Sequence, residues 1–259
     1  MKRFIYGTRL MVAFCVFAFA AAAEAPTQAI LFPELGRLHR AVTTNSVEAQ
    51  EFFDQGLTFS YGFNHAEAIR SYRRAAELDP NCAMAWWGIA LASGPNYNYP
   101  FVDEKVNQQA YEAIQKAASL TGSVTPVERD LIQAQSKRFA MPAPADRLPL
   151  DQAYAAAMRE IYHTYPEDVD VGTLYIESMM NLRPWGLWTP SGQPQPGTLE
   201  IVSTLEKLMA IRPDHAGALH LYIHAMEASA TPEKALEAAN RLRFLVPGAG
   251  HLVHMPSHI

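Results

Sequence analysis

The amino-acid sequence predicts an all-α protein built as a superhelical stack of helix pairs, an α-α solenoid with loop insertions. Apolar residues recur at helical spacing from about residue 45 onward, and prolines close several of these helical stretches. Two of the prolines, Pro213 and Pro247, are 34 residues apart and are followed by similar sequences. A period in the range of about 20 to 50 residues is typical of repeat proteins, whose units bury their apolar faces against one another.

Residues 1–23 have the features of a secretory signal peptide. Lys2, Arg3 and Arg9 precede an apolar run from Leu10 to Ala20, and the small residues of positions 21–23 follow it. This run is shorter than the ~20 residues that a membrane span needs, so we expect cleavage after Ala23 or Ala25 and no membrane span afterwards. The mature protein is then exported, to the periplasm or out of the cell.

The composition of the mature chain argues against nucleic-acid binding and against an intrachain disulfide. Removal of three basic residues with the signal peptide changes the formal net charge from −5 to −8, and an acidic exported protein is not expected to bind nucleic acid. Only Cys82 remains after cleavage, so an intrachain disulfide is excluded.

The first helices follow an extended lead-in at residues 24–44, which has no helical periodicity. The apolar spacing from about Ser46 predicts a helix that reaches Tyr61. Asn64 followed by Glu67 is a capping-box-like start for a second helix, which ends at Leu78. The region of residues 45–259 is therefore expected to form one helical repeat domain.

The next pair is interrupted by an insertion. A helix is predicted from Ala83 to Ser93, and its partner resumes near Val106 after the Gly-, Pro- and Asn-rich residues 94–100. We expect Trp87 to face the inner surface of the stack, where it either packs or stacks on a ligand. Insertions of this kind often lie on the binding face of a repeat protein.

Two more pairs follow before the last proline-closed unit. Helices are predicted from Thr125 to about Phe139, Leu150 to Tyr165, Val169 to Leu182 and Leu199 to Ile211. Residues 183–198 are too rich in proline and glycine for a helix. Trp185 and Trp188 in this loop either shield a site or anchor the loop, and anchoring is the favoured role.

Two units share a pattern of large, small and aromatic residues. In residues 49–80 it comprises Phe52, Gly56, Phe59, Ala68, Tyr72, Ala75 and Pro80, and in residues 216–247 it recurs as Leu219, Ile223, Met226, Ala235, Ala239 and Leu242. This pattern resembles the tetratricopeptide repeat over most of residues 45–259, with Gln55 at a position where leucine is usual. The resemblance implies a concave groove, lined by the first helix of each unit, that binds a peptide or protein.

Six of the nine histidines lie at residue 215 or later. On a helix, His220, His224 and Glu227 share one face within about 60° of arc. The 34-residue shift that superimposes Pro213 on Pro247 also places His254 on His220 and His258 on His224. Metal-ligand spacing therefore occurs twice, one repeat apart.

The resemblance implies that particular positions of each first helix face the groove, and in this chain several of them hold metal-ligand types. The expected ligands are His220, His224, Glu227, His251, His254, His258 and Glu177, with Thr173 as a further groove residue. Imidazole and carboxylate together suit a divalent zinc, copper, nickel or iron ion.

Two other functions remain open. In the second alternative, the histidines are polar residues that line a groove which binds a protein or peptide and holds no metal. In the third alternative the pocket is that of a metal-dependent enzyme which activates water, but no HExxH-type arrangement or nucleophile motif identifies a reaction, so no catalytic residue is assigned.

The last segment carries two expectations. Pro256 cannot donate a backbone hydrogen bond, so we expect its helix to start only near Met255, with His251 and His254 in the preceding turn. The sequence stops at Ile259, inside what should be the first helix of a repeat, so we expect the natural polypeptide to continue.

Overall fold

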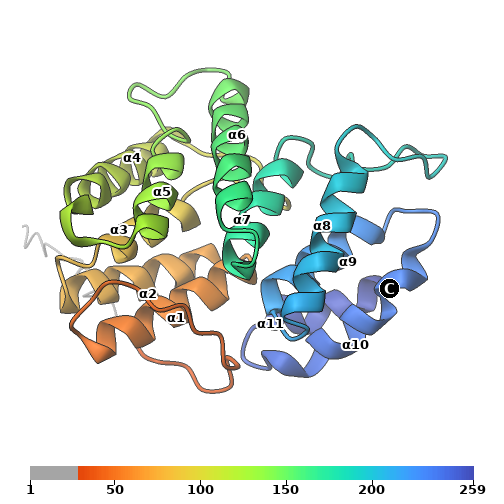
Figure 1. Cartoon of the computed structure of the whole chain (residues 1–259), viewed down its shortest axis with the longest axis horizontal. Coiled ribbons are helices and arrows are strands. Elements are labelled where there is room, and N and C mark those ends of the chain that lie inside the picture. The colour runs from red at the N-terminus through yellow and green to blue at the C-terminus, as the bar shows by residue number, and fades with distance from the viewer. Residues whose placement is uncertain (1–28) are drawn as a thin grey trace, which may run out of the picture.

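The computed structural model describes residues 29–259, and the predicted signal peptide of residues 1–23 lies outside this range. Within it the chain forms helices and loops, and the only β-type pairings are two isolated bridges (Figure 1). None of the helices of residues 29–259 is long and apolar enough to cross a membrane. The predicted all-α class is confirmed.

The helices pack as consecutive pairs with a short final segment. The pairs are α1 (Val47–Tyr61) with α2 (His65–Leu78), α3 (Ala83–Ala92) with α4 (Glu104–Ser119), α5 (Pro126–Gln135) with α6 (Leu148–Thr164), α7 (Val169–Met180) with α8 (Thr198–Ile211), and α9 (Ala216–Met226) with α10 (Leu236–Leu245). Short 3₁₀ helices lie at Thr121–Ser123 and Pro232–Ala235, and α11 (Gly250–His254) is followed by a third, Met255–His258.

Local sequence signals explain most helix ends. The side chains of Ser46, Asn64, Asp103, Thr125 and Asp168 each accept a hydrogen bond from the backbone N–H three residues later, which satisfies a free donor of the first turn. The helices α2, α6, α8 and α10 all end two residues before a proline, as the sequence pattern predicts.

Glycines let three helices approach closely around Tyr72. This side chain of α2 is fully buried, and a Cβ added at Gly56 of α1 or at Gly88 of α3 would overlap its ring. Small residues at these two positions, one in each first helix, are therefore a packing requirement of the repeat.

Replacing Gly88 by alanine is expected to lower the free energy of unfolding by about 1 to 3 kcal/mol, because the buried Tyr72 ring must be displaced. Urea denaturation measures this change. Gly122→Ala is the matched control, since nothing lies within 4 Å of its added Cβ, and it should alter stability by less than about 0.5 kcal/mol. Equal effects of the two substitutions would contradict this packing.

The two ends of the helix stack meet, because α1 packs against α9 as well as against α2 and α3. Every residue of α9 is buried, as are nine of the ten residues of α3. Among the described residues these first helices therefore form core rather than the walls of an open groove. Trp87 of α3 and Thr173 of α7, both expected at the inner surface, are buried within this core.

A buried polar network lies where the two ends of the helix stack, α1 and α9, pack together. Asp170 of α7 accepts hydrogen bonds from the Tyr61 hydroxyl at 2.8 Å and from His215 Nε2 at 3.0 Å, and the Arg40 guanidinium lies at 3.3 Å. His215 Nδ1 accepts the backbone N–H of Ala218, so its proton is on Nε2, which donates to Asp170. The network thus connects the lead-in, α1, α7 and the start of α9.

Gln55, the departure from the repeat pattern, fastens the lead-in. Its amide donates to the Ile30 carbonyl at 2.9 Å and to the Ser71 hydroxyl at 3.0 Å, and its oxygen accepts the N–H of Phe32 at 2.7 Å. A leucine could make none of these bonds. The polar substitution therefore has a structural reason.

Candidate metal centre

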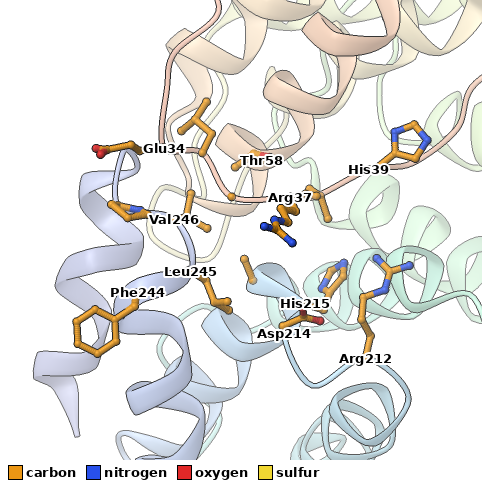
Figure 2. Close-up of a pocket in the computed structure, with 15 residues that line it drawn as sticks. Glu34, Arg37, His39, Thr58, Arg212, Asp214, His215, Phe244, Leu245 and Val246 are labelled. Atoms are coloured by element: carbon orange, nitrogen blue, oxygen red, sulfur yellow. The ribbon is translucent and has the colours of Figure 1, made fainter.

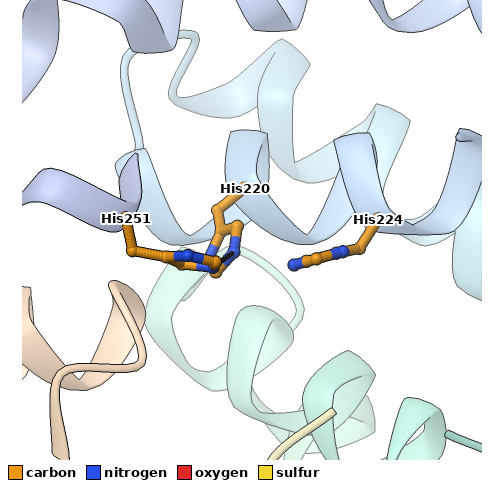
Figure 3. A group of neighbouring side chains, drawn as sticks. All are labelled: His220, His224 and His251. Atoms are coloured by element: carbon orange, nitrogen blue, oxygen red, sulfur yellow. Dashed lines mark hydrogen bonds between the residues drawn. The ribbon is translucent and has the colours of Figure 1, made fainter. Parts of the chain in front are cut away.

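Three imidazoles converge beside the end of the helix stack. His220 and His224 lie one turn apart on α9, and His251 comes from α11 (Figure 3). One nitrogen of each lies within 4.8 Å of the others. His220 and His224 are buried, and His251 is half-buried. This is a set of donors that could hold a metal ion.

The helix α11 places His251 and also His254 on helical backbone. The expectation that the helix starts only near Met255 is therefore wrong. Pro256 removes only the hydrogen bond to the Leu252 carbonyl, and the chain tightens from α to 3₁₀ geometry at Met255.

The His220 ring is fixed by a backbone carbonyl. Its Nδ1 lies 2.6 Å from the Tyr61 oxygen, which can only accept, so the proton is on Nδ1 and Nε2 carries the lone pair. His220 Nε2 and His251 Nε2 are 3.1 Å apart. Two imidazole nitrogens bound to one tetrahedral ion at ~2.0 to 2.1 Å are separated by about 3.4 Å, so little movement is needed to bind.

The His224 ring is fixed by a carboxylate. Its Nδ1 donates to Glu227 Oε1 at 2.8 Å, which leaves the lone pair on Nε2. This Nε2 atom is buried and has no hydrogen-bond partner. A buried acceptor without a partner carries a desolvation cost of about 1 to 3 kcal/mol, and a carboxylate behind an imidazole is the usual arrangement around a metal-binding histidine.

Glu227 orients imidazoles and is not one of the three converging groups. Its second oxygen accepts a hydrogen bond from His258 Nδ1, and His258 Nε2 lies 3.0 Å from His254 Nε2. The three-histidine group also leaves out Glu177, His254 and His258. Of the seven ligands expected from the sequence, the structure brings nitrogens of His220, His224 and His251 together and leaves the other four outside this group.

Burial favours the neutral form of two of the three imidazoles, His220 and His251. Burial lowers the pKa of His220 well below its ordinary value and that of His251 to about 4, and a proton on a neighbouring imidazole would lower both further by repulsion. Burial raises the pKa of Glu227, but hydrogen bonds from His224 and His258 outweigh this and lower it. Neutral imidazoles beside a carboxylate are the state that binds a divalent cation.

Aromatic side chains enclose the cluster. The Phe63 ring centroid lies 4.5 Å from that of His220, and the Tyr97 and Trp185 centroids lie 5.3 and 5.6 Å from that of His224. Phe63 and Trp185 have φ values of 52° and 60°, which non-glycine residues seldom adopt. Such strain concentrates at functional sites. Phe63 was not among the residues expected at the site, because only the tertiary fold brings it here, whereas Tyr97 lies in the insertion of residues 94–100 that was expected on the binding face.

The other residues that the sequence indicated for the groove or the metal site lie outside the group of three histidines. Trp188 donates from Nε1 to the Ala225 carbonyl at 2.6 Å and so anchors its loop to α9. Trp185 contacts His224 in an edge-to-face arrangement and is 53% exposed. The buried Thr173 hydroxyl donates a hydrogen bond to the Val169 carbonyl. Trp87 is packed in the core. Burial raises the pKa of Glu177 to about 7 despite the charge of Arg138.

A cavity of about 420 Å³ adjoins the cluster at His251. It is lined by Gly62, Phe63, Asn64, Asn96, Asn98, Tyr99, Ala249, Gly250 and His251. This cavity therefore brings amide and aromatic groups to the edge of the three imidazoles.

A second cavity, of about 530 Å³, lies elsewhere, between the lead-in, the start of α9 and the segment after α10 (Figure 2). Figure 2 shows charged side chains, among them Arg37 and Arg212, around this cavity. It contains none of the three converging histidines.

Comparisons with known proteins find similarity in structure. No protein-family model matches the sequence, and no curated protein matches it. YrrB, a TPR protein with an unusual peptide-binding site, is similar at a TM-score of 0.39 and 15% identity, over 82% of this chain and 94% of YrrB. The MamA protein is similar at a TM-score of 0.34 and 16% identity, over 75% of this chain and 89% of MamA.

The chain has the architecture of a tetratricopeptide-repeat-like, all-α helical stack. This follows from the consecutive helix pairs and from the spacing of α8 and α10, whose last residues, Ile211 and Leu245, are 34 positions apart. The three-histidine group is set into the last unit of that stack.

Proposed function

We propose that this protein is an exported helical-repeat scaffold that binds a divalent transition-metal ion through His220, His224 and His251. The observation that carries the proposal is the buried Nε2 of His224, which has no hydrogen-bond partner. It belongs to a group in which one nitrogen each of His220, His224 and His251 lies within 4.8 Å of the others. Three neutral imidazoles suit zinc, copper, nickel or iron. Export is proposed from the predicted signal peptide.

The surrounding groups would hold the three rings in place for the ion. The Tyr61 carbonyl and the Glu227 carboxylate each fix a proton on Nδ1 and so direct the Nε2 lone pairs of His220 and His224 to the same space. Three protein ligands leave a fourth tetrahedral position open. The amide-lined cavity at His251 gives a small molecule a route to this position.

A scaffold that binds a peptide without metal is the second candidate. It is favoured by the tetratricopeptide resemblance and by the amide groups of Asn64, Asn96 and Asn98 around the cavity, since amides pair with peptide backbone. In this candidate His224 Nε2 bonds to the peptide or to water. Added metal would then leave the melting temperature unchanged.

Calorimetric titration of the metal-free mature protein with zinc, copper, nickel and ferrous ions tests the proposal. We expect at least one of these ions to bind with a tight first equivalent at pH 7. At a free ion concentration 100 times Kd the folded state gains about 2.7 kcal/mol, which raises the melting temperature. A melting temperature indifferent to all four ions would overturn the proposal and favour the peptide-binding candidate.

A further inference from the structure

We infer that His254 and His258 form a second cation position, so that the centre holds two transition-metal ions side by side. This inference rests on the proposed function, because the second position adjoins the first. It concerns two histidines that the three-donor group leaves out.

The five imidazoles form a closed ring. Successive ring centroids are 4.8 Å apart for His220 and His224, 5.9 Å for His224 and His258, 4.9 Å for His258 and His254, 6.2 Å for His254 and His251, and 4.9 Å for His251 and His220. A tetrahedral site with an open position uses three protein ligands. The ring therefore contains two more imidazoles than the first ion requires.

The His254–His258 pair repeats the spacing of the His220–His251 pair in the first site. Their Nε2 atoms are 3.0 Å apart, compared with 3.1 Å for His220 and His251. His258 Nδ1 donates to Glu227, so its Nε2 carries the lone pair, and the Nε2–H of His254 fills the gap between the rings. A cation replaces that hydrogen when the proton of His254 moves to Nδ1, which lies 3.4 Å from the Ser257 hydroxyl.

Glu227 joins the two positions. One carboxylate oxygen accepts from His224 Nδ1 and the other from His258 Nδ1, so a single negative charge lies behind one imidazole of each site. This charge reduces the repulsion between two neighbouring cations. His254 is exposed and only two imidazoles serve the second position, so the second ion binds more weakly and completes its coordination with solvent.

Native mass spectrometry and equilibrium dialysis with zinc or copper test the inference. We expect two ions in the wild-type protein and one in His254→Ala, with the affinity of the first ion retained within about threefold. The exposed position of His254 makes a folding failure of this variant unexpected. His163→Ala, an exposed histidine of α6, serves as the control and should keep both ions.

Copper adds a spectroscopic readout. Two Cu²⁺ ions in neighbouring positions broaden each other's electron paramagnetic resonance signal, and this broadening should disappear in His254→Ala. A single ion in both the wild type and His254→Ala would overturn the second position and leave the first intact. A wild-type protein that binds no ion would overturn the proposed function as well, so the two failures are distinguishable.

Discussion

Replacing His224 by alanine is expected to weaken binding of the first metal ion by at least about 100-fold. Loss of a group that only orients a metal ligand typically costs about 10- to 100-fold, and His224 is itself one of three donors. The substitution also removes the buried Nε2 that has no partner in the metal-free protein, which relieves a desolvation cost of about 1 to 3 kcal/mol and offsets part of the packing that is lost.

The measurement is a calorimetric titration of His224→Ala beside the wild type and His163→Ala. His163 is exposed on α6 and lies outside the cluster, so its substitution should leave the affinity unchanged. Circular dichroism of the metal-free proteins verifies that all three are folded. An unchanged affinity in folded His224→Ala would remove this residue from the site.

Replacing Asp170 by alanine is expected to lower the free energy of unfolding by about 3 to 5 kcal/mol. The change leaves Arg40, which is 8% exposed, without one of its two carboxylate partners, and leaves the buried Tyr61 hydroxyl and His215 imidazole without an acceptor. Removal of one partner from a buried ionic network typically costs this much. Urea denaturation at pH 7 measures the loss.

Glu237→Ala is the control for this experiment. Glu237 pairs with Arg241 one turn away on the surface of α10, and both side chains are largely exposed. Such a pair contributes less than about 1 kcal/mol. If both substitutions had effects of that small size, the buried network would not hold the ends of the helix stack together.

The Asp170 effect should depend on pH in one direction. Burial raises its pKa, but the hydrogen bond from His215, the charge of Arg40 and the hydrogen bond from Tyr61 hold it well below the ordinary value. Between the folded and unfolded pKa values the unfolded state therefore binds more protons, and stability rises with pH. The stabilisation is present above about pH 4 and is lost below it, so wild type and Asp170→Ala should converge in acid.

The sequence predicted the helices because their signals are local. The apolar period, the capping residues and the prolines after α2 and α10 act within a few residues, and the observed ends agree with them. The histidines of α9 were found for the same reason, since the spacing of His220 and His224 places them on one face of any helix.

Which side chains of the cluster converge depends on contacts between residues that are far apart in the sequence. Glu227 shares a helical face with His224 and so was expected to bind metal, but its carboxylate is occupied by the Nδ1 atoms of His224 and His258. Phe63 reaches His220 across more than half of the chain because α1 packs against α9. The same closure buries Thr173, whose repeat position implies an open groove.

X-ray absorption spectroscopy of protein loaded with one equivalent of zinc tests the central claim most directly, because it identifies the atoms bound to the ion. We expect three imidazole nitrogens at about 2.0 to 2.1 Å with the multiple-scattering pattern of histidine, and one exchangeable oxygen ligand from water. In His224→Ala the histidine contribution should fall or the zinc should be lost. A shell of oxygen atoms without the histidine pattern would contradict a site formed by His220, His224 and His251.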